Sequence, residues 1–111
     1  MARRRFRVDW AGVAVRDLEE IVAFLALDSQ QGTERVLRRI EARAATLESS
    51  PARGRVVPEL ARFQMRTWRE LMIRPYRLVY RIEGDTVTVL AVFDARRDLE
   101  DLLFERLLRS P

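Results

Sequence analysis

Residues 75–99 read PYRLVYRIEGDTVTVLAVFDARRDL, and this stretch decides the fold. Apolar and polar side chains alternate on both sides of Gly84-Asp85, a pair that suits a two-residue turn. The alternation predicts a β-hairpin with one strand at 76–83 and a second that ends at Asp94. Counting outward from the turn pairs apolar residues on one face: Ile82 with Val87, Tyr80 with Val89, Leu78 with Ala91, and Tyr76 with Phe93. This face should cover a core, which leaves Arg77 and Arg81 on an exposed opposite face.

The segments around the hairpin complete an α+β pattern. The spacing of their apolar residues predicts a strand at 4–9, amphipathic helices at 13–27 and 33–47, a further strand at 67–73 and a final helix at 98–109. The connection between the first two helices is short and rich in turn formers, so these helices should form an antiparallel hairpin. We therefore expect the order β-α-α-β-β-β-α, with an antiparallel sheet packed against an N-terminal helical hairpin and a short C-terminal helix.

Length and composition favour one small domain without metal or redox chemistry. At 111 residues the chain is too short to divide into two domains with independent cores, so residues 1–111 should form a single domain. The absence of cysteine and histidine excludes disulfides and thiolate zinc sites and argues against serine-histidine catalysis. No apolar run approaches the ~20 residues that span a bilayer, and the N-terminus does not read as a secretory signal. We expect a soluble, cytoplasmic protein with no cofactor, no bound metal and no membrane partner.

Arginine supplies all 21 cationic residues, and its positive charge is concentrated in particular segments. Residues 51–97 carry ten arginines against five acidic residues, and residues 1–7 carry four arginines and no acid. A coding bias toward arginine in a GC-rich genome accounts for the absence of lysine, whereas the placement of the arginines points to function. Guanidinium groups bind carboxylates and phosphates through two parallel hydrogen bonds. We expect the arginine-rich end of the sheet to bind an acidic or phosphate-bearing partner.

Several sequence blocks together carry a family resemblance that spans nearly the whole chain. They are DLEEIVAF at 17–24, PEL at 58–60, REL at 69–71, PYRLVYRIEGD at 75–85 and VTVLAVFDARRDL at 87–99. In this order and spacing, the chain resembles the RelE/ParE superfamily of type II toxin-antitoxin toxins, also known as plasmid stabilisation proteins. The resemblance implies a stable toxin that a cognate antitoxin holds inactive. Toxins resembling RelE cut messenger RNA on the ribosome, whereas those resembling ParE are associated with poisoning DNA gyrase.

The resemblance also places candidate nuclease residues. Arg77 and either Arg96 or Arg97 match phosphate-binding arginines of the superfamily, and Glu59 matches a glutamate that serves as base in one nuclease branch. RNA cleavage needs a base, an acid and cations near the phosphate. Nuclease branches place a tyrosine or histidine shortly after the terminal arginine, but here DLEDLLF follows, and Phe104 has no hydroxyl. We therefore favour a ParE-like toxin that binds DNA gyrase. The alternatives are a ribosome-dependent messenger RNA endoribonuclease and a decayed member without toxicity.

Six residues are expected to bind the antitoxin or the target. They are Arg69, Arg77, Arg81, Arg96, Arg97 and Trp68. Arg77 and Arg96 are expected to project from one shared surface of the sheet. Structural alternatives stand beside these roles: Arg96 and Arg97 could cap the junction between the last strand and helix, and Glu59 and Glu70 could be ion-pair partners of nearby arginines.

Overall fold

A computed structural model describes residues 4–109 of the chain, with side chains described as far as Arg106. The strands are β1 (Arg7–Trp10), β2 (Arg55–Val56), β3 (Trp68–Ile73), β4 (Tyr76–Glu83) and β5 (Thr86–Asp94). The helices are α1 (Gly12–Ala26), α2 (Gln30–Ala45), α3 (Pro58–Ala61) and α4 (Leu99–Arg109), and two 3-10 turns lie at Thr46–Glu48 and Pro51–Arg53. None of the helices within these residues combines the length and apolar character that crossing a membrane requires.

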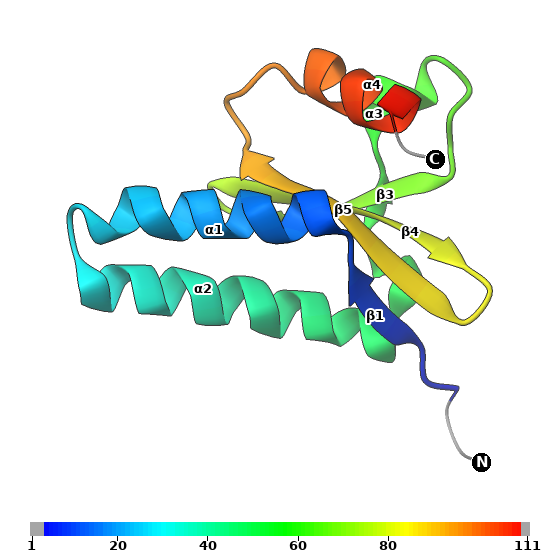
Figure 1. Ribbon diagram of the computed structural model, residues 1–111. Coiled ribbons are helices and arrows are strands. Elements are labelled where there is room, and N and C mark those ends of the chain that lie inside the picture. Colours follow the sequence, from blue (N-terminus) through cyan, green and yellow to red (C-terminus); the bar gives the residue numbers. More distant parts are fainter. Residues whose placement is uncertain (1–3, 110–111) are drawn as a thin grey trace.

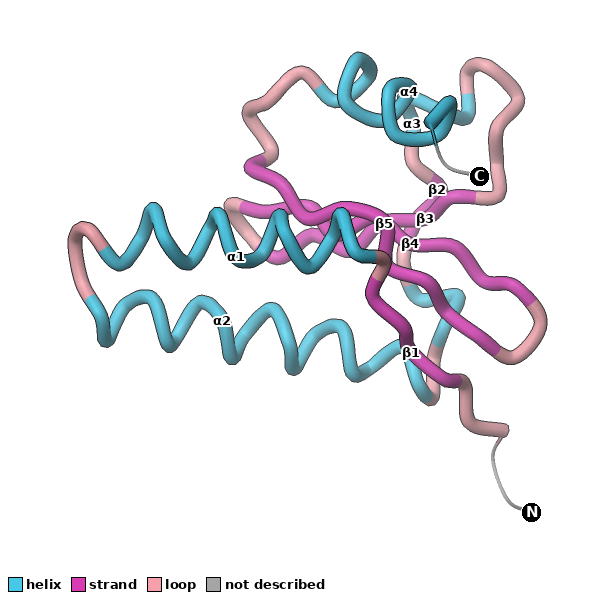
Figure 2. The backbone as a smooth tube through the Cα atoms, viewed as in Figure 1, coloured by secondary structure: helices cyan, strands magenta, loops and turns pink. Residues whose placement is uncertain are grey.

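The strands form one sheet with helices on both sides (Figure 1). Its order is β1-β5-β4-β3-β2, and neighbouring strands run antiparallel except for β1, which runs parallel to β5. The α1-α2 hairpin covers one face, while α3 and α4 lie across the other (Figure 2). The expected α+β class, helical hairpin and C-terminal helix are confirmed. The parallel edge strand and the short β2 and α3 were not expected.

The β4-β5 hairpin has the predicted turn but only part of the predicted register. Gly84 adopts a φ of 62°, the left-handed conformation that glycine tolerates. The pairs of Ile82 with Val87 and of Tyr80 with Val89 are confirmed. Beyond them the pairing shifts by one residue, so that the predicted pairs at the open end of the hairpin, Leu78 with Ala91 and Tyr76 with Phe93, are wrong: Leu78 faces Val92 and Tyr76 faces Asp94.

A β-bulge at Leu90 explains the shift. Tyr80 pairs with Val89 and the preceding Val79 pairs with Ala91, which leaves Leu90 as an extra residue in β5. Leu90 and Ala91 both join the apolar cluster beneath α3 and α4. Simple counting from the turn assumes strict alternation, and an inserted residue reverses the face of every side chain after it.

Charged side chains satisfy the backbone at this bulge. The N–H of Val92 donates to Oδ2 of the buried Asp17 at 3.0 Å. Arg106 of α4 donates to both oxygens of the same carboxylate, at 2.6 Å to Oδ1, and to the carbonyl of Leu90 at 3.3 Å. Asp17 therefore ties α1, β5 and α4 together at the irregular part of the sheet.

The sheet separates two apolar cores. The core under the helical hairpin contains the fully buried Ile40, Leu47, Leu78 and Tyr80, and the core under α3 and α4 contains Val57, Leu60, Val79 and Leu103. The second core covers the face that was expected to be open. Amphipathic helices on both sides are what a sheet with two largely apolar faces requires.

Candidate functional site

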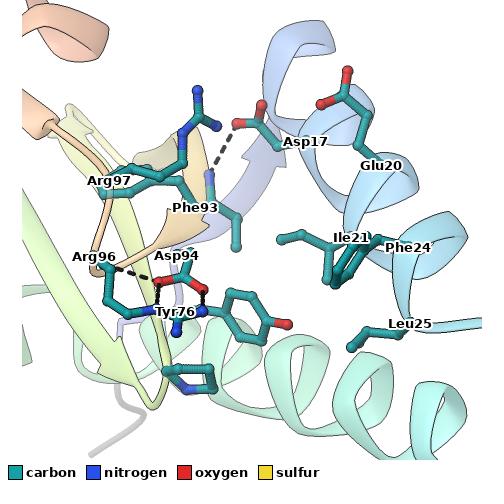
Figure 3. A pocket seen from close by; sticks show the side chains of 12 residues that line it. Asp17, Glu20, Ile21, Phe24, Leu25, Tyr76, Phe93, Asp94, Arg96 and Arg97 are labelled. Atoms are coloured by element: carbon teal, nitrogen blue, oxygen red, sulfur yellow. Dashed lines mark hydrogen bonds and ion pairs between the residues drawn. The ribbon is translucent and has the colours of Figure 1, made fainter. Parts of the chain in front are cut away.

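A groove of about 510 Å³ lies between α1, the start of β4 and the connection that follows β5 (Figure 3). Its α1 wall carries the apolar Ile21, Leu25 and Phe24, of which Phe24 is 72% exposed, and also the acidic Asp17 and Glu20. Arg96 and Arg97 line it from the opposite side. Both arginines are exposed, because they follow the end of the strand instead of alternating within it. The groove thus combines an apolar stretch of α1 with charged side chains of both signs, in which Arg96 and Arg97 supply the positive charge and Asp17, Glu20 and Asp94 the negative.

Asp94 holds Arg96 in place at this groove. One carboxylate oxygen accepts the backbone N–H of Arg96 at 2.9 Å and its Nε at 3.0 Å, and the other accepts Nη2 at 2.7 Å. The side-chain hydrogen bonding of Arg96 first, and its backbone N–H next, lower the pKa of the Asp94 carboxyl from 3.8 to about 2. The Asp94 carboxylate in turn raises the pKa of the Arg96 guanidinium, and the Arg96 side chain remains 87% exposed. Arg96 is therefore bound to the last residue of β5, while the proposed capping of the strand-helix junction by Arg96 and Arg97 stays a prediction.

Tyr76 contributes the phenol that lies in this groove. Its ring is largely buried in the hairpin-side core, and its hydroxyl points toward Leu25 of α1 and away from Arg96 (Figure 3). Burial raises the pKa of Tyr76, and the nearby Asp94 carboxylate adds to the effect. The hydroxyl is therefore protonated near neutral pH and can donate a hydrogen bond to a ligand.

Arg77 lies in a buried ion-pair network, and the expectation that it is exposed is wrong. Its Nε donates to Glu70 at 2.6 Å, and its two Nη atoms donate to the two oxygens of Glu59 at 2.9 Å each. The side chain of Glu70 has no exposed surface and also accepts from Nε of Arg55 at 2.6 Å. Arg77 itself is 8% exposed. The alternative interpretation of Glu59 and Glu70 as ion-pair partners is confirmed.

The other predicted partner contacts are scattered over the sheet. Trp68 is buried beneath α3 and α4, with the Arg81 guanidinium 5.2 Å from its ring centre. Arg81 also pairs with Glu83 at 3.1 Å. Arg69 follows Trp68 on β3, lies on the opposite face of the sheet and donates to the carbonyl of Gly54 at 2.7 Å. Strand alternation separates these side chains, because residues one apart point to opposite faces.

Only Arg96 and Arg97 of the predicted set lie in the groove. Arg77 is enclosed beneath α3, so the expectation that Arg77 and Arg96 share one surface is wrong. Within the predicted nuclease set, the structure brings Glu59 and Arg77 into contact and places both groove arginines elsewhere.

Sequence reasoning missed a second basic group beside the turn from β3 to β4. Arg39 and Arg43 of α2 meet Arg74 of that turn, and Arg39 donates to the Arg74 carbonyl. Their four-residue spacing on α2 was visible in the sequence, but it did not show which strand end the helix would approach. Exposed Phe24 and Leu27 at the end of α1 were also missed. The sequence could have indicated them, because the segment of α1 carries apolar residues on more faces than the one that packs against the core.

Solved structures share this fold. A chain from the chromosomal ParDE toxin-antitoxin system of P. aeruginosa gives a TM-score of 0.68 at 18% identity, with 82% of this chain and 97% of that chain covered. A chain of the RelBE2 toxin-antitoxin complex of Mycobacterium tuberculosis gives 0.61 at 23% identity, covering 81% and 91%. A mutant of the E. coli toxin RelE in the free state gives 0.64 at 16% identity, covering 96% and 99%. At these identities the likeness shows the fold alone.

Sequence comparison goes further than the fold. The family described as "ParE toxin of type II toxin-antitoxin system, parDE" matches residues 8–99. A Sinorhizobium fredii protein named "Putative toxin Y4kP" is 33% identical over 105 residues, which are 93% of this chain and 100% of that protein. The matched region contains the helical hairpin, most of both cores and the groove arginines. The chain therefore belongs to the ParE toxin family of type II toxin-antitoxin systems.

Proposed function

We propose that this toxin inhibits DNA gyrase by binding it and does not cut RNA. The observation that carries the proposal is the separation of the candidate nuclease groups. Glu59 and Arg77 are bound to each other beneath α3, whereas Arg96 and Arg97 lie in the groove beside α1. A nuclease needs its base and its cations around one phosphate.

Two of the groups that line the groove with the exposed arginines, Asp94 and Tyr76, are poor proton acceptors, and the carboxylate of Glu20 lies across the groove on α1. Asp94, the carboxylate that touches Arg96, has a pKa of about 2 and is therefore a weak base at neutral pH. The raised pKa of Tyr76 keeps its hydroxyl protonated. Phe104, at the position where a nuclease needs an acid or base, packs edge-on against Phe63 with ring centres 5.2 Å apart. These features favour binding over proton-transfer chemistry.

We further propose that a cognate antitoxin neutralises the protein by covering the groove. An amphipathic acidic segment would place apolar side chains against Ile21 and Phe24 and carboxylates against Arg96 and Arg97. Family membership supports such a partner, and the M. tuberculosis structure with this fold is itself a toxin-antitoxin complex. The cytoplasm, where gyrase acts, would be the site of action.

Parallel assays on the purified full chain test the target. We expect inhibition of gyrase-catalysed supercoiling and intact messenger RNA on translating ribosomes. The Arg96→Gln/Arg97→Gln double variant should weaken gyrase inhibition. As its matched control, Arg16→Gln/Arg66→Gln removes the same charge from exposed positions outside the groove and should leave inhibition unchanged. Cleaved messenger RNA with normal supercoiling would contradict the proposal and favour the ribosome-dependent endoribonuclease.

Expression without antitoxin in a sensitive bacterium supplies a cellular test. Filamentous growth arrest is expected for a gyrase inhibitor, since blocked chromosome segregation stops division while growth in length continues. Rapid loss of protein synthesis would instead indicate the nuclease. Normal growth, with the toxin shown to be folded, would identify a chain that has kept the fold and lost toxicity.

A further inference from the structure

A second groove, of about 350 Å³, lies where α2 approaches the turn between β3 and β4. Arg39, Arg43 and Arg74 line it together with Met72 and Ile73. In the part of the chain that the structure describes, the side chains of Arg43 and Arg74 make no hydrogen bond or ion pair, and Arg39 donates only to a backbone carbonyl. Three guanidinium groups therefore converge here without an acidic partner.

The arginine row continues along α2. Arg35, Arg39 and Arg43 follow one another at four-residue intervals, which spaces them by about 6 Å along the helix axis and keeps them on one side. Glu34 and Glu41 lie on the other flank of the helix, about 140–200° around the axis from Arg39. Arg38, the remaining arginine of α2, pairs with Glu34, so the flank that approaches Arg74 carries arginines without a nearby acid.

We infer that Arg35, Arg39, Arg43 and Arg74 form a binding surface for the phosphate backbone of double-stranded DNA. A guanidinium binds a phosphate through two hydrogen bonds, and a row of them at regular spacing suits a polymer with a charge on every residue. Contacts of this kind fix a protein on DNA without reading its sequence.

The scarcity of exposed apolar surface favours DNA over an acidic protein. A protein partner generally buries apolar surface together with its charged contacts, but the exposed apolar side chain in this groove is Met72 alone, at 36%. The surface is also distinct from the groove proposed for the antitoxin. Ile73 and Arg74 line the DNA surface, whereas the next residues along the chain, Pro75 and Tyr76, line the other groove. The inference does not require gyrase to be the target.

Fluorescence anisotropy with a labelled 20-base-pair duplex and the purified full chain tests the inference without gyrase present. Between 50 and 200 mM salt, the logarithm of the binding constant should fall with a slope of about −0.9 for each arginine-phosphate contact. The Arg39→Gln/Arg43→Gln variant should reduce that slope by about 2. The Arg16→Gln/Arg66→Gln control has the same net charge and should keep the parent slope.

Three outcomes would overturn the inference. An equal change in the control would mean that net charge alone drives binding. An unchanged slope in the Arg39→Gln/Arg43→Gln variant would exclude these arginines from the contact. Tighter binding of a labelled decaglutamate peptide than of the duplex, lost in the same variant, would assign the surface to an acidic protein segment. Because all four substituted side chains are at least partly exposed, unchanged circular dichroism spectra should accompany each measurement.

Discussion

Replacing Arg77 by methionine should destabilise the fold rather than remove a surface contact. The substitution leaves the side chain of Glu70, which has no exposed surface, without one of its two cationic partners. Breaking a buried ion pair in this way costs about 3–5 kcal/mol. We expect a loss near 3 kcal/mol, the lower end, because Arg55 still donates to Glu70 and because Glu59 is partly exposed and can be hydrated.

Urea denaturation followed by circular dichroism measures this loss. With a slope of roughly 1.5 kcal/mol per molar urea for a domain of this size, 3 kcal/mol lowers the midpoint by about 2 M. Arg81→Met is the matched control, since Arg81 lies on the same strand and face but is 40% exposed, forms its ion pair with the exposed Glu83 and otherwise packs on the Trp68 ring. Its cost should stay below about 1 kcal/mol. An Arg77→Met protein with the parent midpoint but without gyrase or antitoxin binding would refute the reasoning.

This distinction matters for any arginine scan of the protein. A growth assay alone would score Arg77 and Arg96 alike if both substitutions abolished toxicity. The structure gives a different reason for each loss. Substitution of the buried Arg77 would destabilise the folded toxin, whereas substitution of Arg96, which is exposed in the groove, would remove a contact with a partner. Measuring stability beside toxicity separates the two.

Two further predictions concern a tight backbone contact and a pH-dependent ion pair. Gly54→Ala should lower the free energy of unfolding by roughly 1–3 kcal/mol in the same urea assay, because the added Cβ would lie 2.5 Å from the hydroxyl oxygen of Tyr80 and from a backbone carbonyl; an unchanged midpoint would show that the loop can relax. Asp94 should titrate near pH 2 by carboxyl NMR, so its ion pair is complete above 3.8 and is lost as the pH falls toward 2. Arg96→Gln should return this pKa toward 3.8, and a parent value already near 3.8 would argue against the ion pair.

The sequence was sufficient for the elements and for the family. The alternation around Gly84 predicted both strands and the turn, and the apolar spacing of the first two helices predicted their hairpin. These signals are local, since side-chain period and turn chemistry depend on neighbours along the chain. The motif blocks predicted family membership, which the family match to residues 8–99 confirms.

Tertiary structure decided which arginines are available to a partner. Arg77 and Arg81 look equivalent in the sequence, but α3 brings Glu59 onto Arg77 and encloses it, while Arg81 stays half exposed. The bulge at Leu90 likewise has no marker in the local pattern. The exposure of a side chain depends on elements from distant parts of the chain that pack over it, and the periodicity within one strand does not show which element will cover it.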